Sequence, residues 1–196
     1  MASPTTIFTH IPKTGGAAIR KLIRTSYKSW QVYLMKSGTK WKTQYINFPK
    51  QKKKKIKVLM GHQGFGVHEV LLTPFTYFTF FRNPYLVPIS WYYYILSTPD
   101  HCQYEEVSKL SFKEYVGGEA YLSNPHARRL CQENIDKVQK SRYLETAKSN
   151  LQKYYSVIGI VKRYNESLEK LCNLLEIDKL RLRLVEWCKL PLCPSR

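Results

Sequence analysis

The sequence predicts an α/β fold in which a central, mainly parallel sheet is flanked by helices in three layers. Short apolar stretches rich in β-branched and aromatic residues alternate with helical patterns along the chain, as in strand–helix–strand units. Several of these stretches run into glycine-rich or polar loops, which is where open α/β sheets place their chemistry. The 196 residues, 43% of them hydrophobic, predict one domain over 1–196 with a sizeable core.

The first unit is a strand, a loop and a helix. An apolar run over 5–11 predicts a buried strand, the loop 13–16 reads Lys-Thr-Gly-Gly, and 17–29 has the period of a helix with one buried face. The glycines allow a tight turn whose N–H groups can face an anion, and the helix adds its positive N-terminal end. Together with the charge of Lys13, this pattern predicts a site for a phosphate-like group at the sheet edge.

Two other interpretations of this loop stay open at this point. The Walker A motif has its lysine after the glycines, whereas Lys13 precedes Gly15 and Gly16, so the match to that motif is poor. A glycine-rich turn with a solvated lysine is the simpler alternative for Lys-x-Gly-Gly taken alone. The strand before the loop and the helix after it favour the anion site.

A second chemical candidate lies at the end of the next strand. Residues 30–55 mix aromatics and lysines without a clear period, and we predict loop with one short strand there, the lysine run 50–57 being an exposed approach to the next strand. Residues 56–60 predict a short buried strand that ends in Gly-His-Gln-Gly-Phe-Gly at 61–66. A histidine among glycines at a strand's carboxyl end indicates a site; a structural hydrogen bond of a loop histidine is the alternative.

A third candidate comes after residues 74–81, whose aromatics and threonines predict a central strand. Arg82 leaves the end of this strand and could fork onto phosphate oxygens. Ser90, about two turns into the aromatic-rich helix predicted over 85–96, could add a hydroxyl. The alternative, a carboxylate partner for Arg82, is disfavoured because Glu69 is the one acidic residue among the first 99.

The second half of the chain is more acidic and predicts mostly helices. The predicted elements are a helix opening at Ser111 and ended by Gly117-Gly118, a polar helix over 137–153, a buried strand over 154–161, and a helix capped by Asn165 and reaching about Leu175.

Taken together, these motifs resemble the sulfotransferases that use 3′-phosphoadenosine 5′-phosphosulfate (PAPS). Residues 10–16, His-Ile-Pro-Lys-Thr-Gly-Gly, are similar to the 5′-phosphosulfate loop of heparan-sulfate and related carbohydrate sulfotransferases, including the heparan-sulfate 2-O-sulfotransferase type. Arg-Asn-Pro, with a serine eight residues after the arginine, resembles their 3′-phosphate motif. Residues 124–130 resemble a segment near the nucleotide. The resemblance covers about 6–175, fades in the tail 176–196, and implies a P-loop-like fold.

The resemblance implies a reaction and a set of site residues. His62 would be the general base that takes the proton of a carbohydrate hydroxyl, as a histidine pKa near neutrality permits, with His68 or Glu69 as alternatives that orient or replace it. No metal is implied. The implied catalytic residues are His62 and Lys13, and the implied PAPS-binding residues are Lys13, Thr14, Gly15, Gly16, Arg82, Ser90 and Arg128.

The sequence departs from the family pattern at two places. Ala17-Ala18 come after the glycines where relatives commonly have Thr-Ser, and Trp91 stands where many have histidine. The missing hydroxyls remove hydrogen bonds to a 5′-phosphate, so a degenerate sulfotransferase that binds nucleotide without turnover is one alternative function. A P-loop kinase is disfavoured, because the strand ends that should carry an acid for Mg²⁺ carry His62 and Arg82.

The net charge of the chain indicates what kind of partner it binds. The net charge is +18, and residues 1–99 hold fifteen Lys and Arg against one acid, which suits a polyanionic substrate or ligand. A basic module that binds nucleic acid or another polyanion is the second alternative, disfavoured because no known nucleic-acid motif appears. Five cysteines without Cys-x-x-Cys predict free thiols and no zinc site. With no signal peptide or long apolar run visible, we expect either a cytoplasmic, bacterial-type relative without a membrane span or a fragment of a longer protein.

Overall fold

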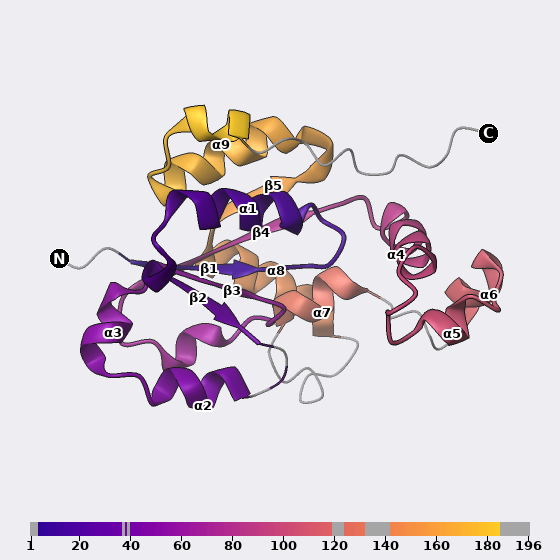
Figure 1. Ribbon diagram of the computed structural model, residues 1–196, viewed down its shortest axis with the longest axis horizontal. Coiled ribbons are helices and arrows are strands. Elements are labelled where there is room, and N and C mark those ends of the chain that lie inside the picture. The colour runs from indigo at the N-terminus through magenta and orange to yellow at the C-terminus, as the bar shows by residue number, and fades with distance from the viewer. Residues whose placement is uncertain (1–3, 37, 39, 119–123, 132–141, 185–196) are drawn as a thin grey trace.

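A five-stranded, all-parallel sheet forms the centre of the protein in a computed structural model (Figure 1). The structure describes residues 4–36, 38, 40–118, 124–131 and 142–184. The strand order is β2-β3-β1-β4-β5. The strands are β1 (Thr5–Thr9), β2 (Val32–Met35), β3 (Val58–Gly61), β4 (Phe75–Phe81) and β5 (Tyr155–Ile160).

Helices cover both faces of this sheet and give the three layers that the sequence predicts. The α-helices are α1 (Gly16–Ser26), α2 (Lys40–Ile46), α3 (Lys50–Lys55), α4 (Leu86–Leu96), α5 (Tyr104–Val107), α6 (Phe112–Gly117), α7 (Pro125–Cys131), α8 (Tyr143–Tyr154) and α9 (Tyr164–Leu175). Short 3₁₀ turns are η1 (Ser29–Gln31), η2 (Val67–Val70), η5 (Val161–Arg163) and η6 (Lys179–Leu184).

Alternation along the strands divides the core into two layers. Phe8 and Phe78 stack with ring centroids 4.6 Å apart on the face covered by α1 and α9. Ile7 and Tyr77 face the other way, into the layer formed with α2, α7 and α8. Helices α4 to α6 form a separate small cluster around Ile95 and Tyr115 beside the sheet. Helix α1, which follows the loop 10–16, is therefore packed directly on the central strands.

The prediction of loop over 30–55 is wrong for most of these residues. One short strand is present as expected, β2, but α2 and α3 occupy much of the rest. Trp41 and Tyr45 are buried one turn apart on α2, so that helix has a buried face. Helix α3 buries no residue; the lysine run is exposed as predicted, but it is helical, since lysine is a good helix former and favours the last turn.

Two predicted boundaries change at the other end of the chain. Helix α9 begins at Tyr164 with Arg163 in the cap position, so the predicted cap at Asn165 is wrong. Ser167 explains the change: its hydroxyl accepts from the Ile160 N–H at 2.9 Å and donates to the Arg163 carbonyl at 2.7 Å, tying the helix to the end of β5. Helix α8 covers 143–154, and 137–141 of the predicted helix lie outside the described residues.

Cys102, Cys131 and Cys172 are free thiols, and the other two cysteines lie outside the described residues. Within the described ranges, no group of three or more metal-ligating side chains is present. No helix in the described part of the chain is long and apolar enough to cross a membrane.

Candidate active site

The parallel sheet brings the three predicted loops to one edge. In the register of β1 with its two neighbours, Thr9 lies opposite Gly61 on one side and Thr79 on the other. Because β3, β1 and β4 are adjacent, the residues that leave their carboxyl ends meet at that edge. They are His62 after β3, the loop 10–16 after β1, and Arg82 after β4.

The loop 10–16 has the left-handed backbone geometry that its glycines suggest. Gly15 has φ 81°, and a Cβ there would lie 2.8 Å from the Tyr164 ring, whose hydroxyl donates to the Gly15 carbonyl at 2.7 Å. Lys13 also has a left-handed φ of 66°, which is uncommon for a residue with a side chain and concentrates at functional sites. Buried Thr14 donates to the Ile11 carbonyl at 2.7 Å and closes the turn.

Helix α1 starts directly behind this loop. It begins at Gly16, has no acidic residue in its first turn and receives no side-chain cap from Gly15. The N–H groups of its first turn are therefore suited to an anion. Ala17 is exposed, and Ala18 packs against the core of that face. Neither alanine carries a hydroxyl that could donate to an anion at this site.

Two cations converge on the loop. The Lys13 ammonium lies 4.1 Å from the centre of the Tyr94 ring, a cation–π contact with α4. The Arg82 guanidinium donates to the Lys13 carbonyl at 3.3 Å. Burial, and next the charge of Arg82, lower the pKa of Lys13, and burial lowers the pKa of Arg82. Ser90 is half-buried on α4 four residues before Tyr94, hence on the same helix face.

His62 lies at the opposite side of the loop and is held from two directions. Its ring packs against the ring of His10, with centroids 4.6 Å apart and planes at 43°, although the residue as a whole is exposed. Its backbone carbonyl accepts a hydrogen bond from the Arg129 guanidinium of α7. Partial burial, then the charges of Arg129 and Arg20, lower the pKa of His62. The imidazole is therefore neutral at pH 7 and can accept a proton.

His10 and Arg129 have no role in the sequence-based prediction of the site. His10 is 6% exposed, and its ring is so close to α1 that a Cβ on Gly16 would lie 2.0 Å from its Nε2. Burial, then His62, Arg20 and Arg129, lower the pKa of His10 to about 3. The position of His10, first after the strand, is a usable signal for it, but nothing local points to Arg129, 67 residues from its partner His62.

The remaining predicted residues lie elsewhere or make no described contact to the loop. Arg128 is half-buried on α7, while its neighbour Arg129 contacts His62. His68 is joined to the Tyr77 hydroxyl through its N–H at 3.0 Å and its Nδ1 at 2.9 Å. Glu69 pairs with Lys42 at 3.8 Å. His68 and Glu69 thus have structural partners on the α2 side of the sheet.

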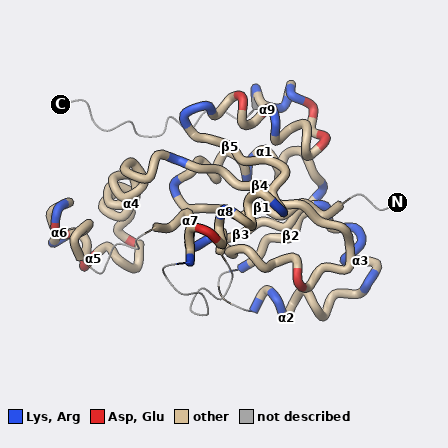
Figure 2. The backbone as a smooth tube through the Cα atoms, turned by 180° about the vertical axis from the view of Figure 1, so that it is seen from behind, with Lys and Arg blue, Asp and Glu red and all other residues tan. Residues whose placement is uncertain are grey.

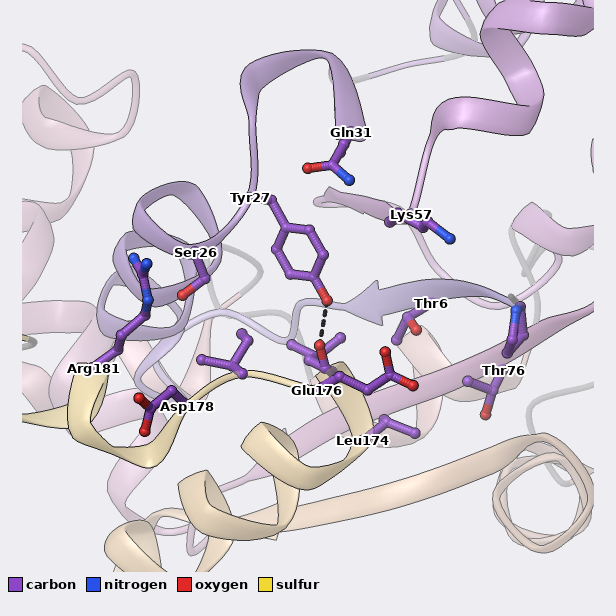
Figure 3. A pocket seen from close by; sticks show the side chains of 13 residues that line it. Thr6, Ser26, Tyr27, Gln31, Lys57, Thr76, Leu174, Glu176, Asp178 and Arg181 are labelled. Carbon is purple, nitrogen blue, oxygen red and sulfur yellow. Dashed lines mark hydrogen bonds between the residues drawn. The ribbon is translucent and has the colours of Figure 1, made fainter. Parts of the chain in front are cut away.

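Two of the hollows lined by described residues adjoin the sheet. A groove of about 520 Å³ lies beside α1, and its lining residues are Ala17, Arg20, Lys21, Arg24, Thr25, Leu34 of β2 and Met60 of β3. A pocket of about 460 Å³ opens at the opposite strand ends, between Thr6, Tyr27 and Glu176, and its described lining includes none of the predicted site residues (Figure 3). The groove adjoins the start of α1, because its lining residue Ala17 directly follows Gly16 of the loop.

This edge of the α/β sheet brings together a glycine-containing loop, a strand end followed by an arginine, and a histidine. The chain belongs to the sulfotransferase family, whose model matches residues 4–188. The predicted sulfotransferase family and the predicted P-loop-like α/β fold are therefore confirmed. The crystal structure of mouse sulfotransferase SULT7A1 complexed with PAP is similar in fold, with a TM-score of 0.57 at 12% identity over 98% of this chain and 67% of that one. No curated protein matches the chain.

Proposed function

We propose that the protein moves the sulfuryl group of PAPS to a hydroxyl of a carbohydrate acceptor, with His62 as general base. The observation that carries this proposal is the meeting of three features at one sheet edge: the loop 13–16, Arg82 and a neutral His62. The first two can bind a nucleotide with phosphates at both ends, and the third can activate a hydroxyl.

Charge and geometry support PAPS as the donor in this proposal. The loop amides of Thr14, Gly15 and Gly16 and the Lys13 ammonium would receive the 5′-phosphosulfate, since helix N-termini and loop N–H groups suit anions. Arg82 and Ser90, from the end of β4 and from α4, would hold the 3′-phosphate, with Arg128 as a further contact. The bound PAP of the mouse sulfotransferase, the desulfated form of this donor, supports the assignment.

This scheme requires no metal. The acceptor oxygen attacks sulfur in line while His62 takes its proton, the bond from sulfur to the phosphate oxygen breaks, and PAP leaves. Lys13 and the loop amides offset the negative charge that grows on the leaving phosphate. The lowered pKa of His62, caused by its own partial burial and by the charges of Arg129 and Arg20, keeps a proton acceptor available at neutral pH.

The groove along α1 is the acceptor site in this proposal. Its described lining includes three basic residues, Arg20, Lys21 and Arg24, and no acidic residue. Lys and Arg also outnumber Asp and Glu along the backbone as a whole (Figure 2). A groove of this charge favours an acceptor that already carries carboxylate or sulfate groups, and long-range attraction would speed its encounter. The acceptor class is therefore an anionic glycan.

Transfer of radioactive sulfate from PAPS to anionic and neutral oligosaccharides of equal length tests this proposal. We expect Arg24→Glu to raise KM for the anionic acceptor about tenfold or more, because it reverses a charge in the groove. Lys28→Glu is the matched control, since Lys28 is an exposed residue outside the groove. Labelling of neutral chains alone would contradict the acceptor class. PAP binding without transfer to any glycan would identify a protein that holds nucleotide without turnover.

A further inference from the structure

We propose that His10 is a positioning residue that fixes the imidazole of His62 relative to the phosphate loop. This inference rests on the proposed role of His62 as general base. His10 itself does not take the proton in this scheme, because it is buried to 6% exposure whereas His62 is exposed. It acts through its contacts with the two parts of the site that must be aligned.

The first contact is with the loop. His10 directly follows β1, and its ring lies against Gly16, the first residue of α1. A Cβ at Gly16 would lie 2.0 Å from Nε2, 2.3 Å from Cδ2 and 2.8 Å from Cε1 of that ring. The ring therefore occupies the space that any side chain at Gly16 would need, and the start of α1 cannot approach β1 more closely.

The second contact is with the base. The rings of His10 and His62 are 4.6 Å apart, and His10 is braced from behind by Phe8, at 5.3 Å, which is stacked on Phe78 in the core. Phe8 and Phe78 are fully buried. A rigid aromatic column thus runs from the middle of the sheet to His62, and His10 is its last buried member before the exposed His62.

The electrostatic surroundings suit a ring that stays neutral. The charged and titratable groups that act on His10 are His62, Arg20 and Arg129. A second positive charge among them would oppose protonation of His62 during the reaction. A neutral, flat ring can pack against both Gly16 and His62 without that penalty, whereas a lysine or arginine could not.

A double-mutant cycle between His10 and His62 tests the proposal. His10→Ala is expected to lower kcat about 10- to 100-fold, since a misplacement near 1 Å has effects of that size, with the Kd of PAP changed less than about threefold. His10→Phe keeps an aromatic ring and should recover part of the loss. In a His62→Ala background, His10→Ala should change kcat less than about twofold, because a residue that acts through His62 has nothing left to position.

The outcomes separate this inference from the function on which it rests. Equal losses of kcat in both backgrounds, or a loss of PAP binding that matches the loss of kcat, would overturn the positioning role. A kcat that His62→Ala leaves unchanged would refute the base assignment instead. In that case, NMR titration of His62 in wild type and in His10→Phe still decides: a shifted His62 pKa and resonance position support coupling of the two rings, and identical titrations overturn it.

Discussion

Replacing His62 by alanine is expected to lower kcat about 10²- to 10⁴-fold, the usual contribution of a general base, while PAP binds with unchanged affinity. The reason is the arrangement of the site: His62 follows β3 on one side of β1, whereas Arg82 follows β4 on the other side and donates to the Lys13 carbonyl. Transfer assays and calorimetry on the same preparations measure the two effects separately. His68→Gln is the control, since His68 is hydrogen bonded to Tyr77 away from the loop.

The dependence of kcat on pH should also show that His62 acts as the base. Partial burial and the nearby Arg129 and Arg20 hold the pKa of His62 below its usual 6.5. The proton-accepting form therefore predominates above pH 6.5 and is lost as the pH falls through the lowered value, so kcat should decline on the acid side below 6.5. His62→Ala should remove this limb. Loss of PAP binding in His62→Ala would mean that His62 is structural.

Replacing Lys13 by alanine is the second large effect, an expected loss of about 10²- to 10³-fold in turnover, comparable to the removal of a group that stabilises charge in a transition state. Lys13 and alanine both carry a Cβ, so the left-handed φ of 66° is equally strained in both proteins. The fold should survive, because the ammonium contacts the partly exposed Tyr94 ring at 4.1 Å rather than a core residue.

Single-turnover transfer from saturating PAPS measures this effect without interference from product release. Lys36→Ala, a change at an exposed lysine, removes the same charge elsewhere and should leave turnover within about twofold, as substitutions away from a site usually do. Unaltered sulfation by Lys13→Ala would remove the loop from the mechanism.

The fold could be predicted where composition and period agree. The threonine- and aromatic-rich β4 and the strand–loop–helix unit of β1 and α1 can be inferred from local pattern alone. Helix α3 could not be found that way, because a helix of lysines and one glutamine has no buried face and therefore no hydrophobic period. The predicted start of α9 is wrong because a tertiary contact, Ser167 with the Ile160 N–H, fixes it in place of a local cap.

The site likewise has residues that the sequence predicts and contacts that it does not. The loop 10–16, His62 and Arg82 are predictable because each comes directly after a strand, and parallel strands bring their carboxyl ends together. The contacts that hold these residues are long-range: Tyr94 with Lys13, Tyr164 with Gly15, and Arg129 with His62. These partners lie far apart in sequence, so spacing carries no information about them.

Calorimetric titration with PAP, ADP and ATP in the absence of metal tests the central claim most directly, that this edge binds a nucleotide phosphorylated at both its 3′ and 5′ ends. PAP should bind at least about tenfold more tightly than ADP or ATP, since the 3′-phosphate adds a charge-assisted contact. Arg82→Ala should abolish that preference, and Arg82→Lys, which keeps the charge but loses the fork, should retain only part of it. Equal binding of all three nucleotides, or none, would contradict the assignment of the donor site.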